Sequence, residues 1–343
     1  MKIFECPNCS QRVYFENARC LNCASGLLYD PEAAAFALAN SDGVYPCANA
    51  AECACNWKAG PGAFCRACVL NKIIPNLSIA GNRERWTRVE EAKKRMIYSL
   101  LCFGLAVGPK HYPDDEVGLA FDFLADPFGA GPGGERILTG HDNGLITLNV
   151  AEADSAERER MRARLGENYR TLLGHFRHEV GHYYWERLIR DDATRLDRFR
   201  AVFGDERTDY EAALRAYYAS GAPPDWQDRC ISAYAASHPW EDWAESWAHY
   251  LHITDTLEMV HSLNFPLGRL ETVDDNRLAQ GDTGNPPGGQ ASPTPFEKIL
   301  ERWLVLSEAS NSINRCMGLP DLYPFVISPR AAEKLRFVHE LLS

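Results

Sequence analysis

Nine of the twelve cysteines in this 343-residue chain lie within its first 68 residues. They include three Cys-x-x-Cys pairs, which begin at Cys6, Cys20 and Cys65. A segment this short buries little apolar surface, so its stability must come from disulfides or from bound metal. Secretion would favour disulfides, but the first ten residues, MKIFECPNCS, contain no apolar stretch or cleavage site typical of a signal peptide. We therefore expect a cytoplasmic protein whose cysteines bind zinc.

The first two pairs predict a zinc ribbon in residues 1–40. Ten residues separate the pairs, and two such pairs can close a tetrahedral site of four thiolates. A redox-active pair is the alternative, but two pairs at this spacing favour metal. The predicted ligands of this first structural zinc are Cys6, Cys9, Cys20 and Cys23.

A second cysteine cluster predicts another zinc-binding, ribbon-like module in residues 41–80. Five cysteines compete there for four coordination positions. The spacing leaves open whether Cys53 or Cys55 is a ligand, and a group of free thiols is the alternative to a metal site. We therefore expect one or two structural zinc ions in the chain. Our assignment for the second is Cys47, Cys55, Cys65 and Cys68.

The charge balance argues against binding to nucleic acid. The chain has 36 basic and 47 acidic residues, a net charge of −11. Affinity for nucleic acid depends on clustered basic side chains, so we expect ribbons that are structural or that bind a protein partner. The longest nearly uncharged apolar run, Met96–Gly108, is too short to cross a bilayer, and we expect no membrane partner.

The pattern changes after the cysteine clusters and predicts a mostly helical domain with a small sheet in residues 85–343. Strands are expected at Phe121–Leu124 and at Leu145–Val150. A loop rich in proline and glycine is expected at 281–295. The predicted class is α+β. Helices are expected at 89–107, from about 156, and at 169–190, 193–220, 240–261, 296–316 and 328–342.

The most specific motif is His178-Glu-Val-Gly-His182, inside the helix predicted at 169–190. Four residues apart on a helix, two imidazoles lie on one face and can bind the same zinc ion. Zinc lowers the pKa of a bound water toward neutrality, and Glu179 can accept its proton and pass it to a leaving amine. We expect His175 to be a satisfied neighbour, because a fourth protein ligand would close the site.

A catalytic zinc also needs a third protein ligand and an open position. Glu241 and Glu245 lie four residues apart in the segment His238–Tyr250, so they share one helical face. One can bind zinc while the other orients a ligand histidine. The tryptophans and alanines around them indicate burial, and a buried carboxylate needs a partner.

These two motifs resemble those of the gluzincin metallopeptidases of the anthrax lethal factor type. In that group a His-Glu-x-x-His motif is followed at a distance by Glu-x-x-Ala-Glu, as at 178–182 and 241–245 here. The resemblance implies that Glu241 binds zinc and that Glu245 supports a ligand. It also implies that Tyr234, seven residues before Glu241, stabilises the oxyanion.

The whole chain also resembles a bacterial family of predicted zinc-binding metallopeptidases with N-terminal zinc ribbons. The resemblance implies a zincin-like fold, in which the strand at 145–150 lies beside the cleft and can pair with a peptide substrate. We expect a zinc-dependent peptidase; the alternative is a zinc-stabilised adaptor that binds a protein without cutting it. The segments that carry the likeness are Cys47-Ala-Asn, Cys55-Asn-Trp, Cys65-Arg-Ala-Cys68, Arg177–Trp185 and Pro239–Glu245.

Overall fold

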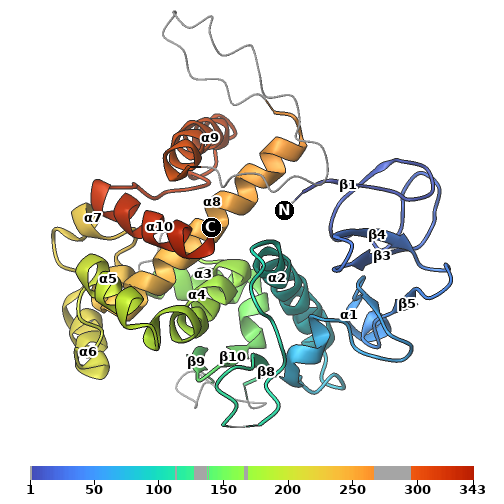
Figure 1. Cartoon of the computed structure of the whole chain (residues 1–343), viewed down its shortest axis with the longest axis horizontal. Helices are drawn as coiled ribbons and strands as arrows, with labels where there is room; N and C mark the ends of the chain where they lie inside the picture. Colours follow the sequence, from blue (N-terminus) through green and yellow to red (C-terminus); the bar gives the residue numbers. More distant parts are fainter. Residues whose placement is uncertain (1, 113, 127–136, 138, 166–168, 266–294) are drawn as a thin grey trace, which may run out of the picture.

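The computed structural model describes residues 2–112, 114–126, 137, 139–165, 169–265 and 295–343. Within these ranges, small cysteine-rich modules precede a mostly helical domain with a small mixed sheet (Figure 1). This architecture confirms the predicted α+β class. Most of the loop predicted at 281–295 lies outside the described residues.

The cysteine-rich segment consists of turns and three small antiparallel sheets. The sheets pair β1 with β2, β3 with β4, and β5 with β6. A one-turn helix, α1 (Ala50–Cys53), lies between the last two strands. The strands are β1 (Phe4–Glu5), β2 (Arg12–Val13), β3 (Leu27–Asp30), β4 (Ala35–Leu38), β5 (Tyr45–Pro46) and β6 (Lys58–Ala59).

An aromatic cluster joins this segment to the first long helix, α2 (Asn82–Cys102). The ring of Tyr98 in α2 lies 5.1 Å from that of Phe15 and 6.0 Å from that of Tyr29, measured between centroids. Trp57 contacts Phe15 and Tyr29, and all four side chains are buried. Aromatic pairs of this kind add about 0.5–1.5 kcal/mol each to the effect of burial. The cysteine-rich segment therefore shares a core with the helical domain.

The central sheet has the strand order β7-β8-β10-β9. The first three strands run parallel, and β9 is antiparallel to β10. Both predicted strands are present, as β8 and β10. Because β10 has a partner on each side, the expectation that it pairs with a substrate is wrong; the outer strands are β7 and β9. The bounds are β7 (Asn71–Ile73), β8 (Ala120–Leu124), β9 (Gly140–Asp142) and β10 (Leu145–Asn149).

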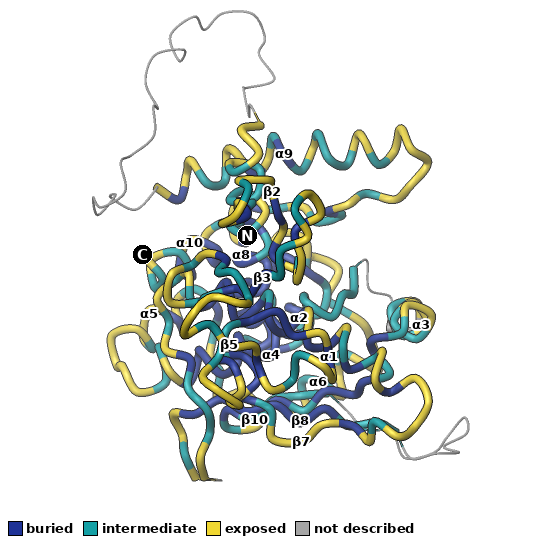
Figure 2. Tube along the Cα trace, turned by 90° about the vertical axis from the view of Figure 1, so that its right-hand side faces the viewer, coloured by how far each residue is buried: buried dark blue, intermediate teal, exposed yellow. Residues whose placement is uncertain are grey.

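The helices pack against this sheet and against one another. Figures 1 and 2 place α9 at the opposite end of the molecule from the sheet, and in Figure 2 buried segments run through α4, β8 and β10. Among the described residues, no helix has both the length and the apolar character needed to cross a membrane. The remaining helices are α3 (Ser155–Leu165), α4 (Leu172–Trp185), α5 (Ala193–Phe203), α6 (Tyr210–Ser220), α7 (Trp226–Arg229), α8 (Pro239–Ser262), α9 (Phe296–Cys316) and α10 (Pro329–Leu342).

Two helix predictions were wrong, one at its ends and one in its middle. The helix expected at 89–107 begins at Asn82 and ends at Cys102, because Gly81 and Gly104 adopt positive φ angles on either side of it. The helix expected at 193–220 is two helices. Gly204, with φ of +105°, ends α5, and the side chain of Asp209 caps the start of α6.

Candidate metal centre

Helices α4 and α8 approach each other closely at Gly181. A Cβ atom on this residue would lie 3.1 Å from the Cα of Ala244 and 3.2 Å from Cδ1 of Trp247. The buried indole of Trp243 donates a hydrogen bond of 2.7 Å to the carbonyl oxygen of Gly181. Glycine at this position therefore allows the two helices to bring their polar, buried residues together.

Three of these buried residues converge: His178 and His182 from α4, and Glu241 from the first turn of α8. The two Nε2 atoms are 3.3 Å apart. Oε2 of Glu241 lies 2.9 Å from Nε2 of His178 and 3.5 Å from Nε2 of His182. A tetrahedral zinc ion with bonds of about 2.0–2.1 Å holds its ligand atoms about 3.3 Å apart. The three atoms therefore have the spacing of a zinc ligand set.

The electrostatics of this group also fit a bound cation. Oε2 of Glu241 is buried and, apart from the two imidazoles, has no hydrogen-bond partner among the described residues. Burial raises the pKa of Glu241, but the neighbouring imidazoles of His182 and His178 hold it well below its usual range. An ionised carboxylate oxygen that faces two imidazole nitrogens is a suitable ligand set for a divalent metal ion.

Other side chains orient the candidate ligands from outside the group. Nδ1 of His178 donates to Oε1 of Glu245 over 2.8 Å, which leaves a lone pair on Nε2. The hydroxyl of Ser232 holds the other oxygen of Glu245 at 2.6 Å. The hydroxyl of Tyr210 donates to Oε1 of Glu241 at 2.6 Å. Each contact fixes a carboxylate or imidazole in the orientation that metal binding requires.

Sequence reasoning missed Tyr210 and Ser232. Neither lies in a motif, and both reach the group only through tertiary folding. His238, at the start of the segment that contains Glu241, has a recognisable local role. Its Nδ1 accepts the backbone N–H of Trp240 at 3.1 Å, and Pro239 follows at the first helical position. This cap fixes the start of α8 and so the position of Glu241.

His182 is held by ring contacts instead of a carboxylate. Its ring stacks on that of His141 in β9 at 6.2 Å and meets Trp240 edge-on at 5.3 Å. Its Nδ1 is buried and has no hydrogen-bond partner among the described residues. The outer strand β9 therefore borders the group at His182.

Glu179 and Tyr234 lie next to the three candidate ligands. Burial raises the pKa of Glu179, but a hydrogen bond from His175 and the nearby imidazoles bring it below its usual value. The ring of Tyr234 lies 5.9 Å from that of His178. Burial and the charge of Glu241 raise the pKa of Tyr234. At neutral pH the carboxylate is therefore ionised and the phenol can donate a hydrogen bond.

The first cysteine group has the geometry of a metal site. The Sγ atoms of Cys6 and Cys23 are 3.7 Å apart, those of Cys9 and Cys20 are 3.6 Å apart, and all four thiols are free of disulfides. Zinc–sulfur bonds of about 2.3 Å at tetrahedral angles place sulfur atoms about 3.8 Å apart. The four thiols thus match the spacing of a zinc ribbon.

The second group gathers Cys55 with Cys47, Cys65 and Cys68. The Sγ atom of Cys55 lies 3.7 Å from those of Cys65 and Cys68. Cys53 faces the carbonyl oxygen of Asn49 at 3.5 Å and belongs to a different trio, with Cys68 and Glu90. On geometry, the four-thiol set therefore contains Cys55 and leaves Cys53 beside it.

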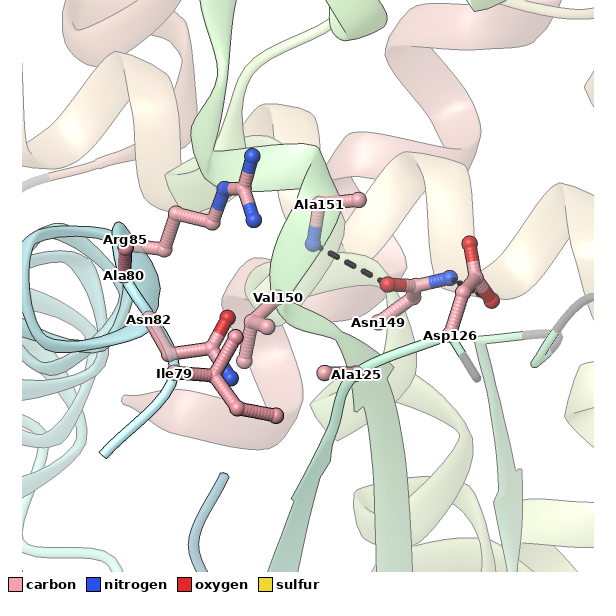
Figure 3. Close-up of a pocket in the computed structure, with 9 residues that line it drawn as sticks. All are labelled: Ile79, Ala80, Asn82, Arg85, Ala125, Asp126, Asn149, Val150 and Ala151. Carbon is pink, nitrogen blue, oxygen red and sulfur yellow. Dashed lines mark hydrogen bonds between the residues drawn. The ribbon is translucent and has the colours of Figure 1, made fainter. Parts of the chain in front are cut away.

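A cavity of about 270 Å³ lies at the carboxyl ends of β8 and β10, beside the start of α2 (Figure 3). Its polar residues already have partners. Asn149 donates to Asp126 at 2.8 Å and accepts from the backbone of Ala151 at 3.0 Å, and Arg85 pairs with Asp154 at 2.8 Å. None of the predicted site residues is among those described as lining this cavity.

A His-His-Glu group on two packed helices, preceded by two four-cysteine groups, defines the class of zinc-ribbon proteins with an HExxH-type metal site. Comparison with known families agrees. Residues 82–341 match the family described as "Putative zinc-binding metallo-peptidase", and residues 3–79 match a zinc-ribbon domain. The chain therefore belongs to this metallo-peptidase family, which confirms the predicted family and its ribbon.

Similar proteins occur in mycobacteria. Uncharacterized proteins from Mycobacterium bovis and from two strains of Mycobacterium tuberculosis are 41% identical to the chain over 347 aligned residues. The alignments cover 100% of this chain and 95% of each relative. No solved structure matches the chain significantly.

Proposed function

We propose that the protein is a zinc-dependent peptidase with its active site between α4 and α8. The convergence of His178 Nε2, His182 Nε2 and Glu241 Oε2, with ionised Glu179 beside them, is the observation that carries this proposal. A zinc ion held by these three side chains would keep one coordination position open and would lower the pKa of a water molecule there toward neutrality.

The chain's own residues then perform the proton transfers. Glu179 accepts a proton from the attacking water and passes it to the leaving amine. Tyr234, whose hydroxyl stays protonated, donates to the oxyanion that forms on the peptide carbonyl; one such donor contributes about 10²–10³ in rate. Glu245 keeps the His178 ring in its binding orientation, and Tyr210 does the same for the Glu241 carboxylate.

The two cysteine groups hold structural zinc ions in this proposal. Their zinc would stabilise a segment that has little core of its own, and cysteines without disulfides are typical of the reducing cytoplasm. The first ribbon also exposes Leu21 and Tyr14, with 91% and 51% of their surfaces accessible. Exposed apolar side chains on the ribbon are compatible with a protein partner.

The experiment that tests the peptidase proposal compares the wild-type protein with Glu179→Gln on a library of proteome-derived peptides. We expect zinc-dependent cleavage by the wild type, which a chelator abolishes. Glu179→Gln should keep its zinc and lose hydrolysis, and Glu333→Gln, at an exposed position of α10, should behave as the wild type. Equal cleavage by wild type and Glu179→Gln would refute the mechanism, and binding without cleavage by the wild type would favour the adaptor.

A further inference from the structure

A series of three side chains extends from Glu179 away from the candidate ligands: Glu179 and Glu152 are buried, and His175 between them is half-buried. Nε2 of His175 lies 3.2 Å from Oε1 of Glu179, and Nδ1 of His175 lies 2.8 Å from Oε2 of Glu152. His175 is one turn before Glu179 on α4, and Glu152 belongs to the 3-10 turn that follows β10. An imidazole donates to two carboxylates only when both ring nitrogens carry a proton.

Glu152, the side chain farthest from the candidate ligands, is held by further contacts. The hydroxyl of Thr139 donates to Oε1 of Glu152 at 2.6 Å, and the guanidinium of Arg170 lies 3.3 Å from Oε2. The side chain of Asn149 caps the turn that carries Glu152 by accepting from the backbone of Ala151 at 3.0 Å. Glu152 is therefore fixed by residues outside α4, one of which is the last residue of β10.

The charges of Glu179, His175 and Glu152 alternate in sign. Burial lowers the pKa of His175, but the carboxylates of Glu152 and Glu179 raise it to about 9. Burial raises the pKa of Glu152, but His175 and Arg170 bring it down to about 2. At neutral pH a cationic imidazole therefore lies between two carboxylates. In a buried site, this arrangement needs all three groups in place.

We propose that Glu152 and His175 are positioning residues that hold the general base by one oxygen and leave its other oxygen for the proton of the attacking water. The inference rests on the peptidase function proposed above. With Oε1 bound to His175, the Glu179 carboxylate cannot rotate freely about its terminal bond. Misplacing a catalytic group by about 1 Å can lower the rate about 10²-fold. A contact that fixes the carboxylate of Glu179 prevents this loss.

The contacts of His175 with Glu179 and Glu152 can be tested without any enzyme activity. In full-length, zinc-loaded protein labelled with ¹⁵N-histidine, both ring N–H protons of His175 should give downfield NMR signals protected from exchange with water. His175→Gln should remove both signals. His339 lies on α10 and is hydrogen-bonded to Tyr250 of α8, so His339→Gln should leave both signals in place. If His175→Gln removed no protected ring signal, the hydrogen-bonded chain would not exist.

Kinetics then test the positioning role. Glu152→Gln keeps the shape of the side chain and removes its charge. We expect kcat to fall about 10- to 100-fold, with KM and zinc content unchanged. Glu159→Gln on the neighbouring helix α3, where the side chain is exposed, is the matched control and should keep wild-type kcat. His175→Gln, whose amide can still donate to Glu179, should retain more activity than His175→Leu.

The outcomes separate the two proposals. Wild-type turnover with unchanged kcat in both Glu152→Gln and His175→Leu would overturn the positioning role alone. A wild-type protein that binds zinc at His178 and cleaves no peptide would overturn the peptidase proposal, and the role of the chain with it.

Discussion

Nδ1 of His178 lies 2.8 Å from Oε1 of Glu245, four residues beyond Glu241 on the same face of α8. One helix therefore presents two carboxylates to one imidazole, the first at Nε2 and the second at Nδ1. The second contact selects the tautomer in which Nε2 is free for a metal ion.

Removal of this carboxylate should weaken metal binding without removing a ligand. We expect Glu245→Ala to reduce zinc affinity about 10- to 100-fold, because His178 then loses its orienting partner. Competition with a chromophoric chelator measures the affinity. Glu333→Ala on α10 is the control. An unchanged affinity in Glu245→Ala would show that the contact does not orient the histidine.

The close approach of α4 and α8 predicts a packing defect in Gly181→Ala. The new methyl group would meet the backbone of Ala244 and the Trp247 side chain at 3.1–3.3 Å, so the helices must separate. Overpacking of this kind costs about 1–3 kcal/mol in the free energy of unfolding, and zinc affinity should fall with it. Gly108→Ala is the control, since nothing lies within 4 Å of its added Cβ.

The two tyrosines near the group should respond differently to loss of their hydroxyls. Tyr210→Phe removes the hydrogen bond to Glu241 and should lower zinc affinity. Tyr234→Phe should leave zinc binding unchanged and lower kcat about 10²- to 10³-fold, because its hydroxyl acts only on the oxyanion. Equal effects of both changes on metal affinity and kcat would contradict these separate roles.

The pH dependence of stability follows from His175. Burial opposes protonation, but Glu152 and Glu179 raise the pKa of His175 to about 9, above its usual value of about 6.5. Its contribution to folding stability is therefore complete below pH about 6.5 and is lost as the pH rises through about 9. The difference in unfolding free energy between wild type and His175→Gln, measured with zinc in excess, should shrink from pH 6 to pH 10. A constant difference would contradict the assigned charge.

Local spacing is what the sequence predicted best. His178 and His182 lie one turn apart, so a helical segment is enough to bring them together, and the Cys-x-x-Cys pairs are equally local. Glu241 is 59 residues beyond His182. Its place beside the histidines came from the resemblance of the second motif and not from any periodicity.

Contacts that depend on the path of the chain could not be predicted. Tyr210 reaches Glu241 from a separate helix, and Glu152 reaches His175 from a turn after the sheet; neither has a local pattern. The strand order is another example. The pattern at 145–150 predicts a strand, but only the fold shows that β9 covers one side of it. Helix ends were missed where glycines at 81, 104 and 204 adopt positive φ.

The zinc content of the purified protein tests the central claim most directly, because we expect one zinc ion in each cysteine group and one held by His178, His182 and Glu241. Mass spectrometry under native conditions should find three zinc ions in the wild type and two in His178→Ala, with the fold retained. Two zinc ions in both proteins would contradict the claim that the histidines and Glu241 hold a metal ion.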